Sequence, residues 1–400
     1  MSRKSSTTTE GNATTGTTRA LRTLLISPYA IFPAWAGGKI RIVALAREFA
    51  KLGHEVTVLT PWHPRQRARL YGDEPFRVRQ VPYPFLLPLV FTDRPFPFTY
   101  LVSFHPGYSA AVGRMIEDFD VVQFEHVSFA DMLPVVPRSA VVGYDAHNVE
   151  FDYVRQECRQ GWVADVAGRR IHRLERILTE SSDCVFPVSN VDQERMASLY
   201  GLHAAKCTPA PNGIHASRQA SADDDAMVCR LPGLQRFRTR AIFSGSNVDH
   251  NRRAIAFLLE RVAPAAPDVG FVIHGTAAIP FLDACSLSNV FFDEDLACTS
   301  FADYAVTGMI GLNPVETGGG TNLKLLHYLS HGLSVLSTPF GMRGYDDLAA
   351  YVRVERSDAF AAALTKGGFP RPPPPDMLMD RYSWQMIAAR MMQAYSQRLT

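Results

Sequence analysis

Three consecutive glycines between a strand-like and a helix-like segment constrain this chain more than any other stretch of it. Residues 310–314 form a β-rich run, and Gly318 to Gly320 follow shortly after. Thr321 and Asn322 are good helix caps, and apolar residues then recur at helical spacing up to Gly332. Glycine lets the backbone approach a ligand closely, and the first amides of a helix bind phosphate. The stretch therefore predicts either a phosphate-binding turn or a plain βαβ crossover whose glycines serve only the turn.

The predicted helix after the glycines carries a single polar stripe. Lys324, His327 and His331 lie at positions i, i+3 and i+7, so they share one face of an otherwise apolar helix. His327 and His331 also have the i, i+4 spacing of a two-histidine metal pair. The sequence places no third ligand beside them, so we predict no metal site here.

Strand and helix patterns alternate from the beginning of the chain. Residues 23–27 predict a strand, residues 40–52 an amphipathic helix and residues 55–60 a second strand, which is the opening of a doubly wound parallel sheet. Further strands are predicted at 121–126, 140–145, 184–189, 240–246, 269–274 and 351–354. The fold class is therefore α/β, with two Rossmann-like doubly wound parallel-sheet domains facing a cleft.

The length of 400 residues is greater than a single core normally holds, so we expect more than one domain. The predicted divisions are a disordered Ser/Thr/Gly-rich tail (1–20), an N-terminal Rossmann-like domain (21–213), a linker (214–238), a C-terminal Rossmann-like domain (239–380) and a terminal helix (381–400).

Composition indicates a soluble globular protein. Hydrophobic residues make up 46% and charged residues 20% of the chain, and the net charge of +2 argues against nucleic acid as the main partner. No apolar run has the length needed to span a bilayer, and the tail lacks the hydrophobic region of a secretory signal. The six cysteines form no CxxC pair, which is typical of reduced thiols in a cytoplasmic protein.

Residues 76–108 are unusually rich in Pro, Phe and Tyr, which excludes a regular helix. Two interpretations stay open for this segment: a packed irregular insertion, or an exposed apolar surface for a lipid-linked acceptor or a membrane face. The basic residues in the nearby segment 63–69 would suit a membrane face, although such side chains are more often only solvated.

Polar or flexible residues follow several predicted strands, at the sheet edge where open α/β sheets bind ligands. Gly37 and Gly38 come after the first strand, without the GxGxxG spacing of a dinucleotide site, so no dinucleotide cofactor is indicated. His147 follows the strand at 140–145. A lone histidine is usually structural, but this position in such a fold favours a functional one.

Several segments resemble glycosyltransferases of the GT-B fold, family 4 type. The resemblance is strongest at residues 313–344, which are similar to the donor-binding segment of that family. The segments 145–150, 210–214, 240–246 and 382–398 resemble further parts of it. The resemblance implies a GT-B fold and transfer of a sugar from a nucleotide diphosphate, usually with retention of the anomeric configuration. It also implies that the last helix packs back towards the first domain.

The resemblance also implies roles for particular residues. His147 would contact the donor sugar near the reaction centre, Gly37 and Gly38 would border donor and acceptor, and Lys324 or Arg343 would balance the diphosphate charge. The donor-binding residues are then Gly245, Asn251, His274 as a wall for the base, Gly318, Gly319, Gly320, Thr321, Asn322, Lys324, His327 and Arg343.

One part of the family pattern differs in this chain. Family members typically carry two glutamates separated by seven residues, the second of which binds the ribose hydroxyls. His327 stands at the second position, the first falls near Gly319, and Glu316 is the nearest carboxylate. A histidine can still bond a ribose hydroxyl.

We therefore expect a cytoplasmic enzyme that needs no cofactor, with peripheral contact at the inner membrane face through residues 76–108 left open. It would transfer a hexose from a nucleotide sugar to a glycan or lipid-linked acceptor. Two alternatives stay open: a binding protein that has lost turnover, and a nucleotide-sugar epimerase.

Overall fold

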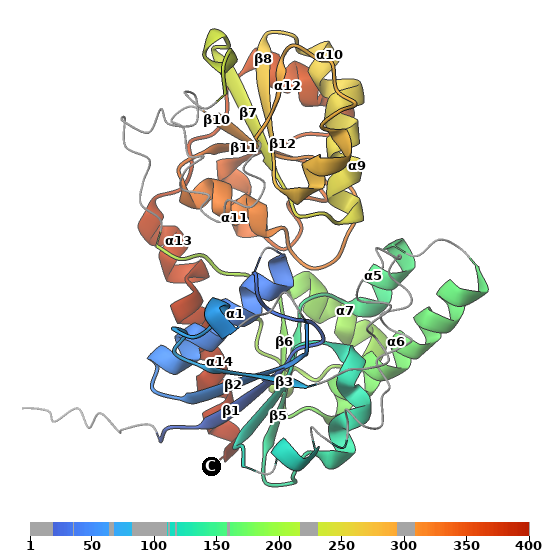
Figure 1. The fold of residues 1–400 in the computed structure, drawn as a ribbon, viewed down its shortest axis with the longest axis vertical. Helices are drawn as coiled ribbons and strands as arrows, with labels where there is room; N and C mark the ends of the chain where they lie inside the picture. The colour runs from blue at the N-terminus through green and yellow to red at the C-terminus, as the bar shows by residue number, and fades with distance from the viewer. Residues whose placement is uncertain are drawn as a thin grey trace, which may run out of the picture.

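The computed structural model describes residues 19–34, 36–63, 68–81, 110, 113–116, 118–157, 161–216, 231–293 and 309–399. The chain forms two α/β domains that meet along the long axis of the molecule (Figure 1). Each domain contains a six-stranded parallel sheet between helices.

The N-terminal sheet has the strand order β3-β2-β1-β4-β5-β6. Its strands are β1 (Arg22–Ile26), β2 (Glu55–Pro61), β3 (Arg77–Val81), β4 (Val121–Phe124), β5 (Val141–Ala146) and β6 (Cys184–Pro187). The central strand β1 is buried along almost its whole length, because helices cover both faces of the sheet. In the register, Ile26 lies between Leu59 of β2 and Phe124 of β4.

The C-terminal sheet has the strand order β12-β11-β10-β7-β8-β9. Its strands are β7 (Thr239–Ser244), β8 (Val269–His274), β9 (Val290–Phe292), β10 (Met309–Asn313), β11 (Ser334–Ser337) and β12 (Val352–Val354). Counted from its own first strand, this sheet has the same order as the N-terminal one. In both sheets the strand order therefore reverses beside the first strand, between β1 and β4 and between β7 and β10. Open α/β sheets bind ligands at such points.

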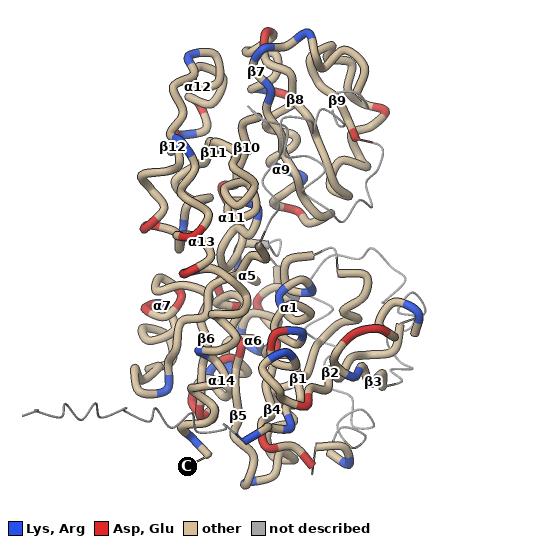
Figure 2. Tube along the Cα trace, turned by 90° about the vertical axis from the view of Figure 1, so that its left-hand side faces the viewer, with Lys and Arg blue, Asp and Glu red and all other residues tan. Residues whose placement is uncertain are grey.

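The helices pack on both sides of the two sheets. The N-terminal domain contains α1 (Gly37–Lys51), α5 (Glu150–Glu157), α6 (Trp162–Ser181), α7 (Asn190–Tyr200) and the 3-10 helix η3 (Val127–Val135). The C-terminal domain contains α9 (Asp249–Phe257), the π-helical turn η6 (Leu258–Val262), α10 (Ala263–Ala265), α11 (Leu323–Ser330), α12 (Phe360–Lys366) and α13 (Pro375–Tyr382). Figures 1 and 2 both place α11 above α1, where the two domains meet.

The last helix, α14 (Trp384–Leu399), leaves the C-terminal domain and packs on the first domain (Figure 1). Trp384 and Tyr395 belong to the same buried cluster as Phe49 of α1 and Phe186 of β6. The Tyr395 hydroxyl donates a hydrogen bond to Oε1 of Gln123, 2.7 Å away. The chain thus passes between the domains twice. The two connecting segments lie side by side and hydrogen-bond through their backbones at Ile214 and Ser383.

Several local expectations are confirmed by the structure. Ser189 caps α7 by accepting a hydrogen bond from the Asp192 amide, and Gly332 follows the end of α11 in the left-handed conformation. No described helix combines the length and the apolar character that a membrane span requires.

Other expectations were wrong in detail. Gly37 and Gly38 are the first residues of α1 and do not form a loop before it. Asn322 stands at the N-cap of α11, but its side chain makes no capping bond. Residues 77–81 of the proline-rich segment form the edge strand β3, and residues 82–108, like the tail at 1–18, lie outside the described residues.

Candidate functional site

A cavity of about 480 Å³ lies between the two domains, at the carboxyl ends of both sheets. It is lined by residues that follow β1, β4 and β5 on one side and β7 and β10 on the other. The predicted site residues that line it are Gly37, Gly38, His147, Gly245, Asn251, Gly319, Thr321, Asn322, Lys324 and His327. Topology thus brings together residues that are far apart in the sequence.

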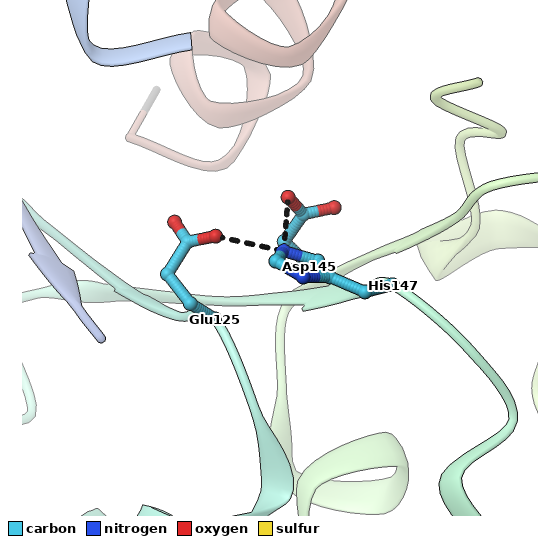
Figure 3. Close-up of side chains that lie close together, drawn as sticks. All are labelled: Glu125, Asp145 and His147. Atoms are coloured by element: carbon cyan, nitrogen blue, oxygen red, sulfur yellow. Dashed lines mark hydrogen bonds and ion pairs between the residues drawn. The ribbon is translucent and has the colours of Figure 1, made fainter. Parts of the chain in front are cut away.

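His147 lies on the N-terminal wall of this cavity beside two buried carboxylates, which Figure 3 shows. Its Nε2 atom is 3.1 Å from Oε2 of Glu125 and 3.4 Å from Oδ2 of Asp145. Glu125 follows β4 and Asp145 lies in β5, the neighbouring strand, so the sheet sets this spacing. The other ring nitrogen, Nδ1, faces Gly38.

These neighbours control the charges of the cluster. Burial by itself lowers the pKa of His147, but its hydrogen bonds to Asp145 and Glu125 outweigh burial and raise that pKa to about 9. Burial raises the pKa of Asp145, but the Arg41 guanidinium and His147 hold it down to about 2. His147 is therefore an imidazolium at neutral pH, with Nε2 directed at carboxylates.

Arg41 completes this cluster and was missed by the sequence reasoning. It is fully buried in α1, and its Nε and Nη2 atoms donate to both oxygens of Asp145, at 2.8 and 2.6 Å. It also donates to the carbonyls of Ala210 and Pro211. An arginine inside the apolar run at 40–46 was the available signal, because a buried charge requires a partner.

Among the described residues, Glu125, Asp145 and His147 lie close enough together to hold a metal ion. Both oxygens of Asp145 already accept hydrogen bonds from Arg41, and Nε2 of His147 faces both carboxylates. Ion pairing within the protein therefore accounts for the arrangement.

The glycine loop between β10 and α11 packs directly on the N-terminal domain. The Gly318 amide donates to Oε1 of Gln156 at 3.0 Å, and Nδ2 of Asn212 donates to Oγ1 of Thr321 at 3.0 Å. A side chain at Gly320 would overlap the carbonyl oxygen of His147. The predicted glycine loop and His147 thus lie against each other.

Three predicted residues lie on the far side of this loop. Gly318, Gly320 and Arg343 line a second, smaller cavity of about 170 Å³, and Gly319 lines both cavities. Arg343 donates to the carbonyl of Gly320 from Nε, at 3.2 Å, and from Nη2. Arg343 therefore supports the loop in this structure and does not line the main cavity.

Lys324 provides positive charge on the C-terminal wall. Its Nζ atom donates to Oδ1 of Asn251 at 2.8 Å and lies 5.0 Å from the centre of the Phe243 ring. Burial lowers the pKa of Lys324 to about 7. The N-terminal ends of α9 and α11 border the cavity beside it, so amides and one ammonium group converge on this wall.

Two histidines also line the C-terminal wall. Burial lowers the pKa of His327 to about 4, and that of His250, which the sequence reasoning did not select, to about 3. Both imidazoles are therefore neutral at pH 7. Glu316 is not part of the cavity, and its side chain accepts a hydrogen bond from Ser357.

The expectation for His274 was wrong as to position. His274 is buried at the end of β8, with Nδ1 2.9 Å from Oγ of Ser244, and it does not line the cavity. All six residues of β8, His274 included, are buried. Ser244 and Gly245 occupy the wall in its place.

The fold is the GT-B fold, which known glycosyltransferase structures share. Over 94% of this chain, sucrose-phosphate synthase of Thermosynechococcus elongatus superposes with a TM-score of 0.70 at 16% identity, and 99% of that protein is covered. HepE of Anabaena, in complex with UDP and glucose, superposes with a TM-score of 0.69 at 12% identity over 94% of this chain and 100% of HepE. WaaG, a glycosyltransferase involved in lipopolysaccharide biosynthesis, gives 0.60 at 17% identity over 94% and 95%.

The sequence of the first domain is similar to one known family. Residues 35–218 match the family model of Glycosyltransferase Family 4. The chain thus has the GT-B fold, and its first domain is similar to family 4 glycosyltransferases. A search of curated protein sequences gave no match.

Proposed function

We propose that this protein transfers a hexose from a nucleotide-diphosphate sugar to a hydroxyl of a glycan or a lipid-linked acceptor, with retention of configuration. The observation that carries the proposal is the cavity itself, in which His147 lies on one wall and Lys324 and two helix N-termini on the other. The complex of the similar fold HepE with UDP and glucose supports a nucleotide sugar as donor.

The two walls suit the charges that develop during glycosyl transfer. The diphosphate leaves with increasing negative charge, which the ammonium of Lys324 and the first amides of α9 and α11 would stabilise. His147 would donate from Nδ1 to the donor sugar, while Glu125 and Asp145 hold its ring. Closure of the cleft around both substrates would exclude water and so favour transfer over hydrolysis.

His327 would lie near the ribose of the donor. As a neutral imidazole on the cavity wall it would exchange a hydrogen bond with a ribose hydroxyl, where family members typically use a carboxylate. This replacement is also the observation that favours the second candidate, a protein that binds the nucleotide without turnover. An epimerase stays an alternative for the same cavity.

The lipid-linked acceptor draws support from the fold it shares with WaaG, which is involved in lipopolysaccharide biosynthesis. We place the enzyme in the cytoplasm, where it would act on acceptors at the inner face of the membrane without a bound cofactor or metal. The proline-rich segment proposed to touch the membrane lies mostly outside the described residues.

One experiment distinguishes these functions. Purified protein is titrated with UDP and GDP, and then incubated with UDP-glucose, UDP-galactose, UDP-N-acetylglucosamine and GDP-mannose, with products followed by chromatography. Release of the nucleoside diphosphate with free or transferred sugar supports the transferase. Diphosphate binding without release of any sugar supports the binding protein, and conversion of one nucleotide sugar into another supports the epimerase.

The role of His147 has its own test within that assay. A His147→Ala variant should lose at least about a hundredfold in turnover while its affinity for the nucleoside diphosphate stays within about threefold, because the imidazole would act at the sugar. Full activity in this variant would remove His147 from the reaction.

A further inference from the structure

The N-terminal wall carries a second titratable pair, which the proposed donor site does not use. His126 follows β4 as the N-cap of η3, and Glu150 is the first residue of α5 after β5. Both line the main cavity. Their side chains are 12% and 3% exposed, and Nε2 of His126 lies 3.3 Å from Oε2 of Glu150.

The hydrogen bonds around His126 define its tautomer. The Ser128 backbone amide donates to Nδ1 at 3.1 Å, and a backbone amide can only donate. Nδ1 is therefore the acceptor, and the ring proton lies on Nε2, directed at Glu150. Nε2 of His126 thus donates to Glu150.

Glu150 is held from its other side by Asn148, whose Nδ2 atom donates to Oε1 at 2.8 Å. Asn148 in turn lies against the glycine loop, since a Cβ atom added to Gly319 would come within 2.6 Å of its Oδ1 atom. The carboxylate of Glu150 therefore has a defined position relative to the loop that borders the proposed donor.

The chemistry of this pair excludes the phosphate end of the donor. A carboxylate in a partly enclosed cavity repels phosphate, while Lys324 and the helix N-termini on the opposite wall attract it. A carboxylate has about four acceptor sites, so it can bind a hydroxyl group in addition to the donors that position it. The complementary ligand is an uncharged group that carries hydroxyls.

We propose that Glu150, positioned by His126 and Asn148, binds a hydroxyl group of the acceptor, and that the acceptor's receiving residue is a neutral sugar. This inference rests on the proposed transferase function and assigns its acceptor subsite. An acceptor with a phosphate or carboxylate beside the reacting hydroxyl would be disfavoured at this wall.

The test uses the full-length protein and the variant Glu150→Gln. This variant keeps the size of the side chain, and it should fold because burial and the charge of Glu150 together raise the pKa of the neighbouring Glu175 to about 7. Removing the Glu150 charge relieves that repulsion. Glu194→Gln, an exposed change on α7, is the matched control.

Binding of methyl glucoside, methyl galactoside and methyl mannoside is measured by NMR titration with saturating UDP. We expect wild type and Glu194→Gln to bind at least one of them, and Glu150→Gln to bind it at least about tenfold more weakly. In turnover with UDP-glucose, the KM for the glycoside should rise equally while the KM for the donor stays unchanged. His126→Phe, which cannot donate to Glu150, should weaken the glycoside in the same way.

Three results would overturn the assignment: equal glycoside binding by Glu150→Gln and wild type, an equal loss of UDP affinity, or no binding of any neutral glycoside by wild type. A wild-type protein that binds the glycoside through Glu150 but hydrolyses no nucleotide sugar would contradict the proposed function alone and leave the subsite assigned.

Discussion

At the scale of single residues, His147 is linked to pH through its carboxylate partners. Burial lowers the pKa of His147, but Asp145 and Glu125 raise it from 6.5 to about 9 in the folded protein. Because the folded pKa is the higher one, this stabilisation is complete below about pH 6.5 and is lost as the pH rises through 9.

We therefore expect the free energy of unfolding to fall by about 3 kcal/mol between about pH 6.5 and 9.5 through this residue. Urea unfolding of wild type and His147→Asn across that range measures the effect, which the variant should lack. The same pH slope in both proteins would show that other groups cause it.

Lys324 predicts a different pH effect, on ligand affinity. Burial lowers the pKa of Lys324 to about 7, so half of the molecules without ligand carry the charge at neutral pH. If this ammonium binds the diphosphate, affinity for UDP should fall by up to about tenfold per pH unit above pH 7, because binding then requires uptake of a proton.

Calorimetry of UDP binding between about pH 6 and 9, in buffers of different ionisation enthalpy, measures both the affinity and the proton uptake. Lys324→Met should bind UDP more weakly at pH 6 and show no proton uptake above pH 7. Equal proton uptake in this variant would assign the effect to another group.

At the scale of elements, the start of α1 depends on one glycine more than on its neighbour. A side chain at Gly38 would overlap the Tyr29 hydroxyl and come within 3.2 Å of Nδ1 of His147, whereas at Gly37 no described residue beyond its chain neighbours and its own helix lies within 4 Å. Gly38→Ala should therefore lower the free energy of unfolding by about 1 to 3 kcal/mol. Gly37→Ala should change it by less than about 1 kcal/mol, since its backbone is compatible with alanine. Thermal unfolding of both variants measures the contrast.

Elements with strong local signals were predictable from the sequence. The strands β2, β8 and β5 combine β-branched residues with clear turn signals. Ser189, a favoured N-cap residue, marks the start of α7. The start of α1 was not predictable, because two glycines normally indicate a loop; the packing of Tyr29 accounts for the glycine at 38 alone. The edge strand β3 was hidden by the prolines that follow it.

At the scale of the whole molecule, the ends of the predicted strands indicated where the cavity lies. The ion pairs around the cavity could not be predicted in this way. The position of His147 after β5 placed it correctly on the cavity wall. The pairing of Arg41 with Asp145 joins residues 104 positions apart, and the glycine loop meets Gln156 across 162 positions. Such contacts depend on how the helices and domains pack, which no local pattern contains. For the same reason His274, at a strand end, was expected on the wall although it does not line the cavity.

The shared core of α14 and the first domain predicts an asymmetric response to truncation. Trp384, Ile387 and Met391 are almost fully buried against residues of the N-terminal domain. Ending the chain after Ser383 should therefore expose the hydrophobic cluster of the first domain and leave the second sheet intact. Hydrogen exchange with mass spectrometry checks this, and we expect loss of protection in β1, β5 and β6 but not in β7, β8 or β10. Uniform loss in both domains would contradict it.

The same helix has a consequence for synthesis of the protein. The chain leaves the ribosome N-terminus first, so the strands of the first domain emerge long before the residues that close its core. The described strands of the second domain end at residue 354 and its buried clusters at Tyr382, just before the helix that completes the first domain's hydrophobic interior. The domain that is translated first is therefore the one that is finished last.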